Sequence, residues 1–253
     1  MIHTLPDTFE AAPDCLQGKN ILVTGAGDGI GRAAALTYAR HGATVVLLGK
    51  TVEKLEAVYD EIEASGGPQP AIYPLHLNGA VFKDYEDLRD TLEKEFGALH
   101  GLLHNASVLG ERKAIGQTSV DSWNEVMQVN VNAQFMLTRS LLPIMDIPDT
   151  ASVIFTSSSV GRTGRAYWGA YAVSKFATEG LVQVLADELA NTSNIRVNSL
   201  NPGATNTAMR RAAYPGESPD TNPMPEEIMP LYLYLMSDAS REQTGLQWNA
   251  QNT

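Results

Sequence analysis

The chain has 253 residues, of which 43% are hydrophobic and 19% charged, a composition typical of a folded globular protein with a sizeable core. Its 29 acidic and 18 basic residues give a formal net charge of −11. A chain this acidic repels a phosphate backbone, and no run of Lys or Arg offers a local basic patch. These values argue against a disordered chain and against a nucleic-acid partner.

The N-terminal residues and the cysteine content indicate the compartment. The single cysteine, Cys15, has no internal disulfide partner, and residues 1–20 lack the basic start and apolar run of a signal peptide. No apolar stretch reaches the about 18 residues expected of a membrane span. We therefore expect a soluble, cytoplasmic protein with no membrane partner.

Short apolar runs alternate with longer segments of helical spacing along the chain. Strands are predicted at 20–24, 44–48, 71–77, 101–104, 152–156, 195–200 and 245–249. Helices are predicted at 30–41, 52–64, 83–96, 122–145, 170–190 and 225–236. This alternation is typical of right-handed βαβ units, whose helices cover both faces of a parallel sheet. The sequence therefore predicts an α/β fold.

No linker divides the chain, so residues 1–253 are predicted to form a single domain, with residues 1–18 as an N-terminal extension. Residues 204–224 are rich in Pro, Gly and polar residues and show no clear periodicity. A patternless stretch of this length is usually a functional lid or a disordered segment. Since it follows a strand end, where open α/β sheets bind ligands, we expect a substrate lid; an idle loop is the alternative.

A glycine-rich turn, TGAGDGIG at residues 24–31, lies between a predicted strand and a predicted helix. Gly25 permits the tight turn, while Gly29 and Gly31 let the backbone approach a pyrophosphate and the helix pack against the sheet. The helix N-terminus offers free N–H groups to that anion. The pattern predicts a dinucleotide site, with an ordinary βα turn as the alternative. Its expected residues are Gly25, Gly27, Asp28, Gly29, Ile30 and Gly31.

The end of the next predicted strand, LLGK, indicates which dinucleotide binds. NAD sites usually carry a carboxylate there, which binds the ribose 2′-hydroxyl. This chain instead has Gly49 and Lys50, and no acidic residue before Glu53. Because a cation suits a 2′-phosphate, we expect Lys50 to bind it and NADPH/NADP+ to be preferred over NADH/NAD+. The alternative is a solvated surface lysine.

Tyr171 and Lys175 lie four residues apart at the start of a predicted helix and therefore share one face. This spacing alone is weak evidence, since Tyr85 and Arg89 nearly repeat it. Ser158 adds weight, because it directly follows an apolar strand. Carbonyl reduction creates an alkoxide that a phenol can protonate, a nearby ammonium lowers the pKa of the phenol, and a hydroxyl can position the carbonyl oxygen. We expect Tyr171, Lys175 and Ser158 to fill these roles.

Taken together, TGxxxGxG, the serine and YxxxK resemble the short-chain dehydrogenase/reductase (SDR) family. The resemblance extends to LHNAS at 103–107, VMQVNVNAQF at 126–135 and IRVNSLNPGATNT at 195–207. The strings TGAGDGIGR, FTSSSVGR and WGAYAVSKFATEG are most similar to a bacterial YciK-type subgroup. The resemblance implies a Rossmann-type doubly wound sheet of seven parallel strands, in the order 3-2-1-4-5-6-7. It also implies association into a homodimer or homotetramer.

The resemblance assigns roles to further residues. It implies that Asn130 holds a water in the proton relay and that Lys175 also binds the nicotinamide ribose. Other implied cofactor contacts are Asn105, Ala106, Pro202, Gly203 and Thr207, besides Tyr171. Ser107 and His76 depart from the family, which has Gly and an adenine-contacting Asp at these positions. The ending LQWNAQNT also lacks the usual Gly-Gly.

The sequence therefore predicts an NADPH-dependent carbonyl reductase, or secondary-alcohol dehydrogenase, for a small molecule. Tyr167, Trp168 and Met209 favour a hydrophobic substrate, although core packing explains them almost as well. The alternatives are an NAD-linked alcohol dehydrogenase and a non-catalytic nucleotide-binding sensor with the same fold. No metal site is expected, since His100 and His104 flank a predicted strand and are more readily structural.

Overall fold

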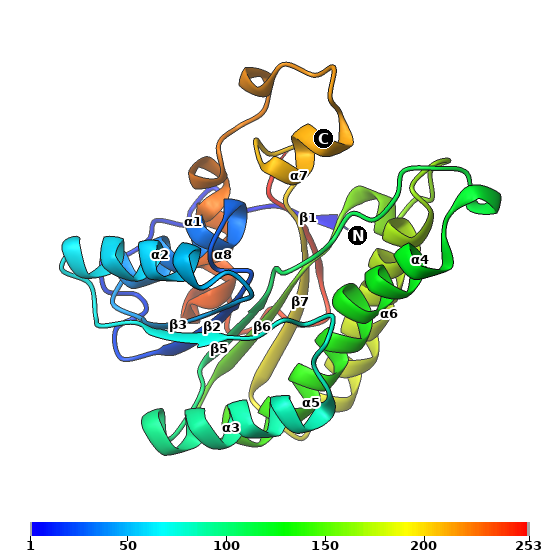
Figure 1. The fold of residues 1–253 in the computed structure, drawn as a ribbon. Helices are drawn as coiled ribbons and strands as arrows, with labels where there is room; N and C mark the ends of the chain where they lie inside the picture. The colour runs from blue at the N-terminus through cyan, green and yellow to red at the C-terminus, as the bar shows by residue number, and fades with distance from the viewer. Residues whose placement is uncertain (1, 252–253) are drawn as a thin grey trace.

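Eight parallel strands form one sheet, in the order β1-β8-β7-β6-β5-β2-β3-β4 (Figure 1). The computed structural model describes residues 2–251. The strands are β1 (Ile2–His3), β2 (Asn20–Thr24), β3 (Thr44–Gly49), β4 (Ala71–Pro74), β5 (Gly101–His104), β6 (Ala151–Thr156), β7 (Ile195–Asn201) and β8 (Gln247–Asn249). The strands β2 to β8 have the predicted order, and the sheet has the predicted Rossmann-type topology.

The prediction of seven strands is wrong by one, because β1 adds an eighth. This two-residue strand pairs with β8, so that Ile2 lies opposite Gln247. The rest of the extension packs on the same side of the molecule: the Phe9 ring meets the Tyr234 ring edge-on at 5.1 Å, and Leu16 is fully buried. A strand of two residues is too short to show any hydrophobic period.

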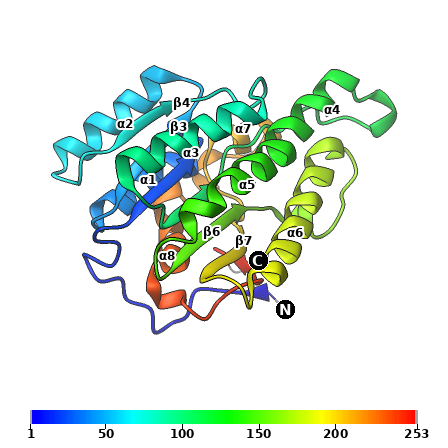
Figure 2. The same cartoon turned by 90° about the horizontal axis from the view of Figure 1, so that it is seen from below.

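Helices cover both faces of the sheet, as predicted. They are α1 (Gly29–Arg40), α2 (Val52–Ala64), α3 (Phe82–Phe96), α4 (Val120–Met127), α5 (Ala133–Met145), α6 (Gly169–Leu189), α7 (Ala208–Ala213) and α8 (Met229–Met236). On one face lie α1, α2 and α8; α3, α4, α5 and α6 cover the other (Figures 1 and 2). In strand β3, Val45 and Leu47 pack toward the first group and Val46 toward the second, which makes two hydrophobic cores.

Two predicted helices are interrupted. The helix expected at 122–145 contains a π-helical turn, Gln128–Asn132, between α4 and α5, and the helix expected at 225–236 starts with a 3₁₀ turn, Pro225–Ile228. The predicted lid contains α7, which its composition did not indicate. Among residues 2–251, no helix has the length and apolarity to cross a bilayer.

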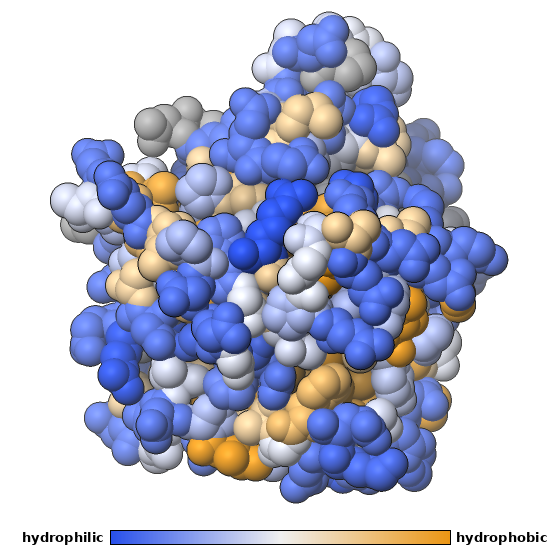
Figure 3. Space-filling view, turned by 90° about the vertical axis from the view of Figure 1, so that its left-hand side faces the viewer, coloured by the Kyte–Doolittle hydropathy of each residue, from blue (hydrophilic) through white to orange (hydrophobic). Residues whose placement is uncertain are grey.

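The surface of the molecule differs from face to face. Figure 3 shows the side that carries α2, where hydrophilic residues predominate and apolar ones form small separate areas. On the opposite side, α5 and α6 expose larger apolar side chains, among them Phe135 (51% exposed) and Phe176 (47%).

Candidate active site

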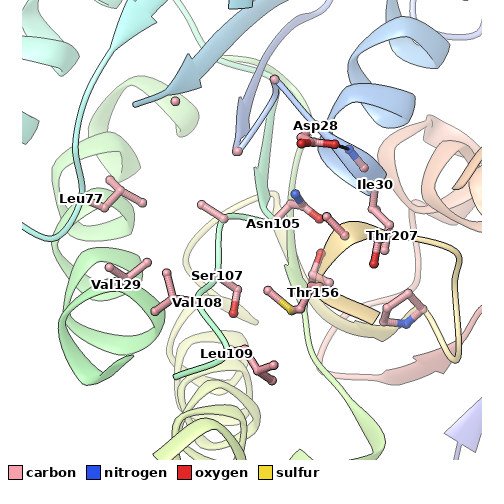
Figure 4. Close-up of a pocket in the computed structure, with 18 of the residues that line it drawn as sticks. Asp28, Ile30, Leu77, Asn105, Ser107, Val108, Leu109, Val129, Thr156 and Thr207 are labelled. Atoms are coloured by element: carbon pink, nitrogen blue, oxygen red, sulfur yellow. Dashed lines mark hydrogen bonds between the residues drawn. The ribbon is translucent and has the colours of Figure 1, made fainter. Parts of the chain in front are cut away.

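A cavity of about 470 Å³ opens at the carboxyl ends of the central strands, where open α/β sheets bind their ligands. It is lined by the glycine turn, the ends of β3 and β6, the segment after β5, the start of α6 and the lid. The predicted site residues in its wall are Gly25, Gly27, Asp28, Gly29, Ile30, Lys50, Asn105, Ala106, Ser158, Tyr171, Lys175, Pro202, Gly203 and Thr207. Figure 4 shows Asp28, Ile30 and Thr207 on one side, Leu77 and Val129 on the other, and Asn105 and Ser107 between them. Two predicted residues, Gly31 and Asn130, do not line the cavity.

The glycine turn is shaped for a close backbone approach. Gly25 and Gly29 have φ values of 67° and 51°, in the left-handed region that favours glycine. A Cβ on Gly31 would lie 2.2 Å from the carbonyl oxygen of Gly25, so no side chain fits there. Asp28 caps α1 by accepting a 2.7 Å hydrogen bond from the Gly29 N–H. The turn therefore brings α1 against the sheet, as the sequence predicts.

Two lysines flank the cavity at the end of β3. Lys50 lines it and is exposed. Lys54, one turn into α2, also lines it and forms an ion pair with Asp28, which holds the pKa of that carboxyl below its usual value. Sequence reasoning missed Lys54, although its i,i+4 spacing from Lys50 places both near the same strand end. Beyond them, the exposed His76 also contributes to the wall.

Thr24 fixes the segment that follows β5, another role that the sequence did not reveal. Its hydroxyl oxygen accepts hydrogen bonds from the backbone N–H groups of Asn105 (2.9 Å) and Ala106 (3.0 Å). The same hydroxyl donates to the carbonyl of Leu103 at 3.2 Å. The threonine before the glycine turn thus ties β2 to the segment that carries Asn105 and Ala106.

The predicted catalytic side chains come together on the far side of the cavity. Tyr171 and Lys175 share one face of α6, and the Lys175 ammonium donates a 2.8 Å hydrogen bond to the Thr156 carbonyl at the end of β6. Ser158 follows β6 and caps the 3₁₀ turn Ser159–Gly161, where its hydroxyl accepts from the Val160 N–H at 3.4 Å. Tyr171 is 9% exposed. The arrangement places a phenol, an ammonium and a hydroxyl in one wall.

Burial dominates the protonation of these groups. It raises the pKa of Tyr171 to about 12, although hydrogen bonding to Ser158 and Ser107 opposes the rise. It also lowers the pKa of Lys175 to about 8, partly offset by the carboxylate of Glu179. Desolvation of the phenolate is the largest effect, so the net shift of the Tyr171 pKa is upward in this structure, and a lowering of this pKa by Lys175 stays a prediction. At neutral pH the phenol keeps its proton and can act as a donor.

Asn130 is fully buried behind the cavity wall, in the π-helical turn. Its side-chain oxygen accepts from the Val108 N–H (2.9 Å), and its amide donates to the Val108 carbonyl (3.0 Å) and to the Ser174 hydroxyl (3.0 Å). Both amide N–H groups are thus used within the protein. The side chain positions the wall at Val108, and the water-holding role expected of Asn130 stays a prediction.

A buried carboxylate, Glu179, anchors α6 to the sheet and was also missed. It accepts hydrogen bonds from the hydroxyls of Ser157 (2.6 Å) and Ser199 (2.7 Å), and it pairs with Arg162 at 2.9 Å. Glu179 lies one helical turn after Lys175, and this spacing could have indicated that it shares the buried face of α6. The network holds α6, which carries Tyr171 and Lys175, against the end of β6 and against β7.

The predicted lid lines the remaining side of the cavity, and Gln251 binds the start of this segment. Thr207 caps α7, since its hydroxyl accepts from the Arg210 N–H at 3.1 Å. Arg210 is held by two 2.6 Å bonds to Glu217 within the lid. Gln251 donates to the carbonyls of Pro202 and Ala204, both at 2.8 Å, a contact that no sequence pattern suggested.

The apolar part of the wall differs from the prediction at one residue. Trp168 and Met209 line the cavity together with Leu109 and Tyr214. Tyr167 does not line it: this residue is 62% exposed and has a φ of 69°. Its backbone turns the ring outward, while the next residue, Trp168, packs 5.8 Å from the Tyr171 ring.

Comparisons with known proteins agree with this geometry. Residues 19–218 match the family model described as short chain dehydrogenase. The chain is 51% identical over 243 residues to the uncharacterized oxidoreductase YciK of Escherichia coli K12, and the match covers 96% of each chain. A short chain dehydrogenase of Shigella flexneri 2a, complexed with NADP, is 51% identical, with a TM-score of 0.93 over 95% of this chain and 100% of that one. Another, of Escherichia coli CFT073 complexed with NADPH, is 51% identical, with a TM-score of 0.93 over 96% of this chain and 100% of that one. The chain therefore belongs to the short-chain dehydrogenase/reductase family of oxidoreductases.

Proposed function

We propose that this protein is an NADPH-dependent carbonyl reductase, which also catalyses the reverse oxidation of a secondary alcohol. The observation that carries the proposal is the shared cavity: the glycine turn lies in one wall, and Ser158, Tyr171 and Lys175 lie in another. A dinucleotide on the turn would extend toward the phenol. The substrate carbonyl then has a place between the nicotinamide and Tyr171.

The residues present fit a dinucleotide. A Cβ on Gly25 would lie 3.1 Å from the Cα of Ala106, so glycine lets the turn pack closely against the segment after β5. The N-terminus of α1 points its free N–H groups at the same region. Asn105 and Ala106 would line the adenine-ribose side, and Pro202, Gly203 and Thr207 would meet the nicotinamide end.

NADP, rather than NAD, is favoured by the charge at the end of β3. Lys50 has no ion-pair partner among residues 2–251, and Lys54 is paired with Asp28. Two relatives of known structure were crystallised with NADP or NADPH. An NAD-linked alcohol dehydrogenase is the second candidate, and it is less favoured because this chain lacks the carboxylate that NAD sites usually carry at this strand end.

The chemistry follows from the protonation states. When bound, NADPH supplies a hydride to the carbonyl carbon. The Ser158 hydroxyl positions the carbonyl oxygen as it gains charge. Tyr171, protonated at neutral pH, donates its proton to that oxygen. Lys175 holds the ribose and keeps a positive charge beside the phenol, and in alcohol oxidation the same phenol accepts the proton.

The apolar wall formed by Leu109, Trp168 and Met209 favours a hydrophobic carbonyl compound. A non-catalytic sensor is disfavoured, because a sensor needs no phenol and ammonium beside the nicotinamide site. We also propose that residues 1–253 form one domain, that residues 204–224 act as a substrate lid and that the protein is cytoplasmic. Exposed apolar side chains of α5 and α6 support a homodimer or homotetramer: Phe135, Val173, Phe176 and Val184.

A panel of aliphatic and aromatic aldehydes and ketones, each incubated with the protein and NADPH, tests the proposal. Loss of the cofactor absorbance at substrate-dependent rates is the expected result. NADPH binding without turnover of any compound would instead favour the sensor. A clear preference for NADH would favour the NAD-linked dehydrogenase.

A further inference from the structure

Ser107 occupies a turn whose backbone is fixed on both sides. The two residues before it, Asn105 and Ala106, have their N–H groups bound to the Thr24 hydroxyl. The residue after it, Val108, has both its N–H and its carbonyl bound to the Asn130 side chain. Ser107 does not have a positive φ, so the turn makes no demand for glycine here. The serine side chain is therefore carried by a rigid backbone.

The Ser107 side chain forms part of the cavity wall that includes Ser158 and Tyr171. Figure 4 shows Ser107 in the middle of this wall, next to Val108 in the chain. Its hydroxyl oxygen is buried, and among residues 2–251 no group forms a hydrogen bond with it. A buried hydroxyl without a partner is unfavourable.

The Tyr171 phenol lines the same cavity wall as the unpartnered Ser107 hydroxyl, and this hydroxyl lowers the pKa of the phenol. Ser158 lowers the same pKa from the segment after β6. The phenol is thus approached by two hydroxyls from two different loops. Only Ser158 already holds another hydrogen bond, from the Val160 N–H.

We propose that the Ser107 hydroxyl is a positioning residue that donates a hydrogen bond to the phenolic oxygen of Tyr171 as this oxygen gives up its proton. The inference rests on the proposed function, in which the proton moves from the phenol to the substrate alkoxide and leaves a negative charge on the phenolic oxygen. That charge then accepts the hydrogen bond of Ser107, and a small movement of a hydroxyl on a fixed backbone completes it.

The elements packed around the Tyr171 phenol carry other titratable groups. Lys175 lies on α6, with Glu179 one turn beyond it; Tyr232 approaches from α8, and His104 lies at the end of β5 near Lys175. Burial keeps Tyr232 protonated and lowers the pKa of His104 to about 3. Arg112 and Arg210 stack on Trp168 and Tyr214 at the cavity entrance. Between pH 5 and 9, Lys175 is thus the group beside Tyr171 that titrates.

The test reads the phenol directly. The protein is labelled with 3-fluorotyrosine, whose more acidic phenol titrates at lower pH, and the fluorine resonance of residue 171 is assigned by its loss in Tyr171→Phe. We expect Ser107→Ala to raise the titration midpoint of residue 171 by about 0.5 to 1 pH unit, the effect of one hydrogen bond. Ser107→Thr, which keeps the hydroxyl, should restore it. Ser107→Gly, with the residue usual in the family, is a second variant without the hydroxyl.

Ser159→Ala is the matched control, since Ser159 is exposed and does not line the cavity. An unchanged midpoint in both Ser107→Ala and Ser107→Gly would overturn the proposal. So would an unchanged midpoint combined with a raised KM, which would make Ser107 a substrate contact instead. The fluorine titration needs no substrate, so a protein that reduces no carbonyl compound would refute the proposed function and leave this test readable. With a substrate in hand, the pH profile of kcat for alcohol oxidation should move upward with the midpoint.

Discussion

The ammonium of Lys175 lies 5.4 Å from the centre of the Tyr171 ring, and it is held there by the carbonyl of Thr156 rather than by the phenol. Both side chains are buried, and burial acts on them in opposite directions, toward a neutral phenol and a neutral amine. The phenol therefore keeps its proton at neutral pH, while the ammonium titrates at a pKa of about 8. The titrations of the two groups therefore fall in different pH ranges.

The charge of Lys175 should control the alkaline side of the reduction. We expect the rate to fall as the pH rises through about 8, because the ammonium loses its proton there. Lys175→Arg should move this loss to higher pH, since a guanidinium stays charged. Lys175→Met should weaken NADPH binding by about tenfold. Steady-state rates recorded against pH measure the first effect, and a fluorescence titration with NADPH measures the second. Lys94→Met, on the surface, is the control. A pH profile of Lys175→Arg that equals that of wild type would contradict the assignment.

The lysine at the end of β3 should decide between the cofactors. We expect Lys50→Ala to weaken NADPH binding by about fivefold and to leave NADH binding unchanged, because an exposed charge pair contributes about 1 kcal/mol. Gly49→Asp should shift the preference toward NADH. A Cβ at Gly49 lies 3.1 Å from the terminal methyl of Leu55, a flexible group that can move aside.

Dissociation constants for the two cofactors, measured for wild type and both variants, check this prediction. Lys54→Ala serves as a comparison, since that lysine is already paired with Asp28. Equal losses of NADPH and NADH affinity in Lys50→Ala would show that Lys50 does not bind the 2′-phosphate.

His104 should make the protein sensitive to acid. Its ring is fully buried, stacks on Phe155 at 4.5 Å and bonds to the Thr138 hydroxyl at 2.8 Å. Burial lowers its pKa from 6.5 to about 3. Between pH 6.5 and 3, His104 therefore binds a proton in the unfolded chain but stays neutral in the folded chain. Its contribution to the free energy of unfolding is complete above pH 6.5 and is lost as the pH falls toward 3.

The free energy of unfolding should change with pH by up to about 1.4 kcal/mol per pH unit between pH 3 and 6.5, because of His104. His104→Asn, which cannot titrate, should flatten this slope in urea unfolding curves recorded between pH 4 and 7. The same change at the exposed His76 should leave the slope as in wild type. Equal slopes in wild type and His104→Asn would mean that other groups govern acid unfolding.

Gln251 should matter more for the cofactor than its place near the C-terminus suggests. Its amide binds the carbonyls of Pro202 and Ala204, and Gly203 between them has a φ of 75°. We expect Gln251→Ala to cost about 1 kcal/mol of stability and to raise the KM for NADPH several-fold, because the segment at the nicotinamide end loses its support. Gln117→Ala, on an exposed 3₁₀ turn, is the control. A KM that stays at the wild-type value would show that the segment is rigid without this contact.

Much of the fold could be predicted because its signals are local. Most of the strands from β2 to β7 are apolar runs between helical segments, and TGAGDGIG marks the turn between β2 and α1. That the candidate catalytic side chains come together in one cavity could be predicted as well, since Tyr171 and Lys175 share a helix face and Ser158 follows a strand. These features depend on spacing along the chain, which a sequence displays.

The missed features depend on contacts between distant segments. Thr24 binds residues about 80 positions later, and Gln251 binds the segment after β7. No period or motif predicts such pairs. The net upward shift of the Tyr171 pKa was missed for a related reason, because desolvation depends on how the whole cavity wall packs around the phenol. The contacts of the Asn130 side chain could not be predicted for the same reason, since its partner Val108 lies on another segment.

The most direct test of the central claim is the rate of NADPH-dependent carbonyl reduction by Tyr171→Phe, measured beside its affinity for NADPH. The account predicts that kcat falls by at least about 100-fold while the dissociation constant for NADPH stays within about twofold of wild type, because only the proton donor is lost. A Tyr171→Phe variant that reduces the same compound at the wild-type rate would contradict it.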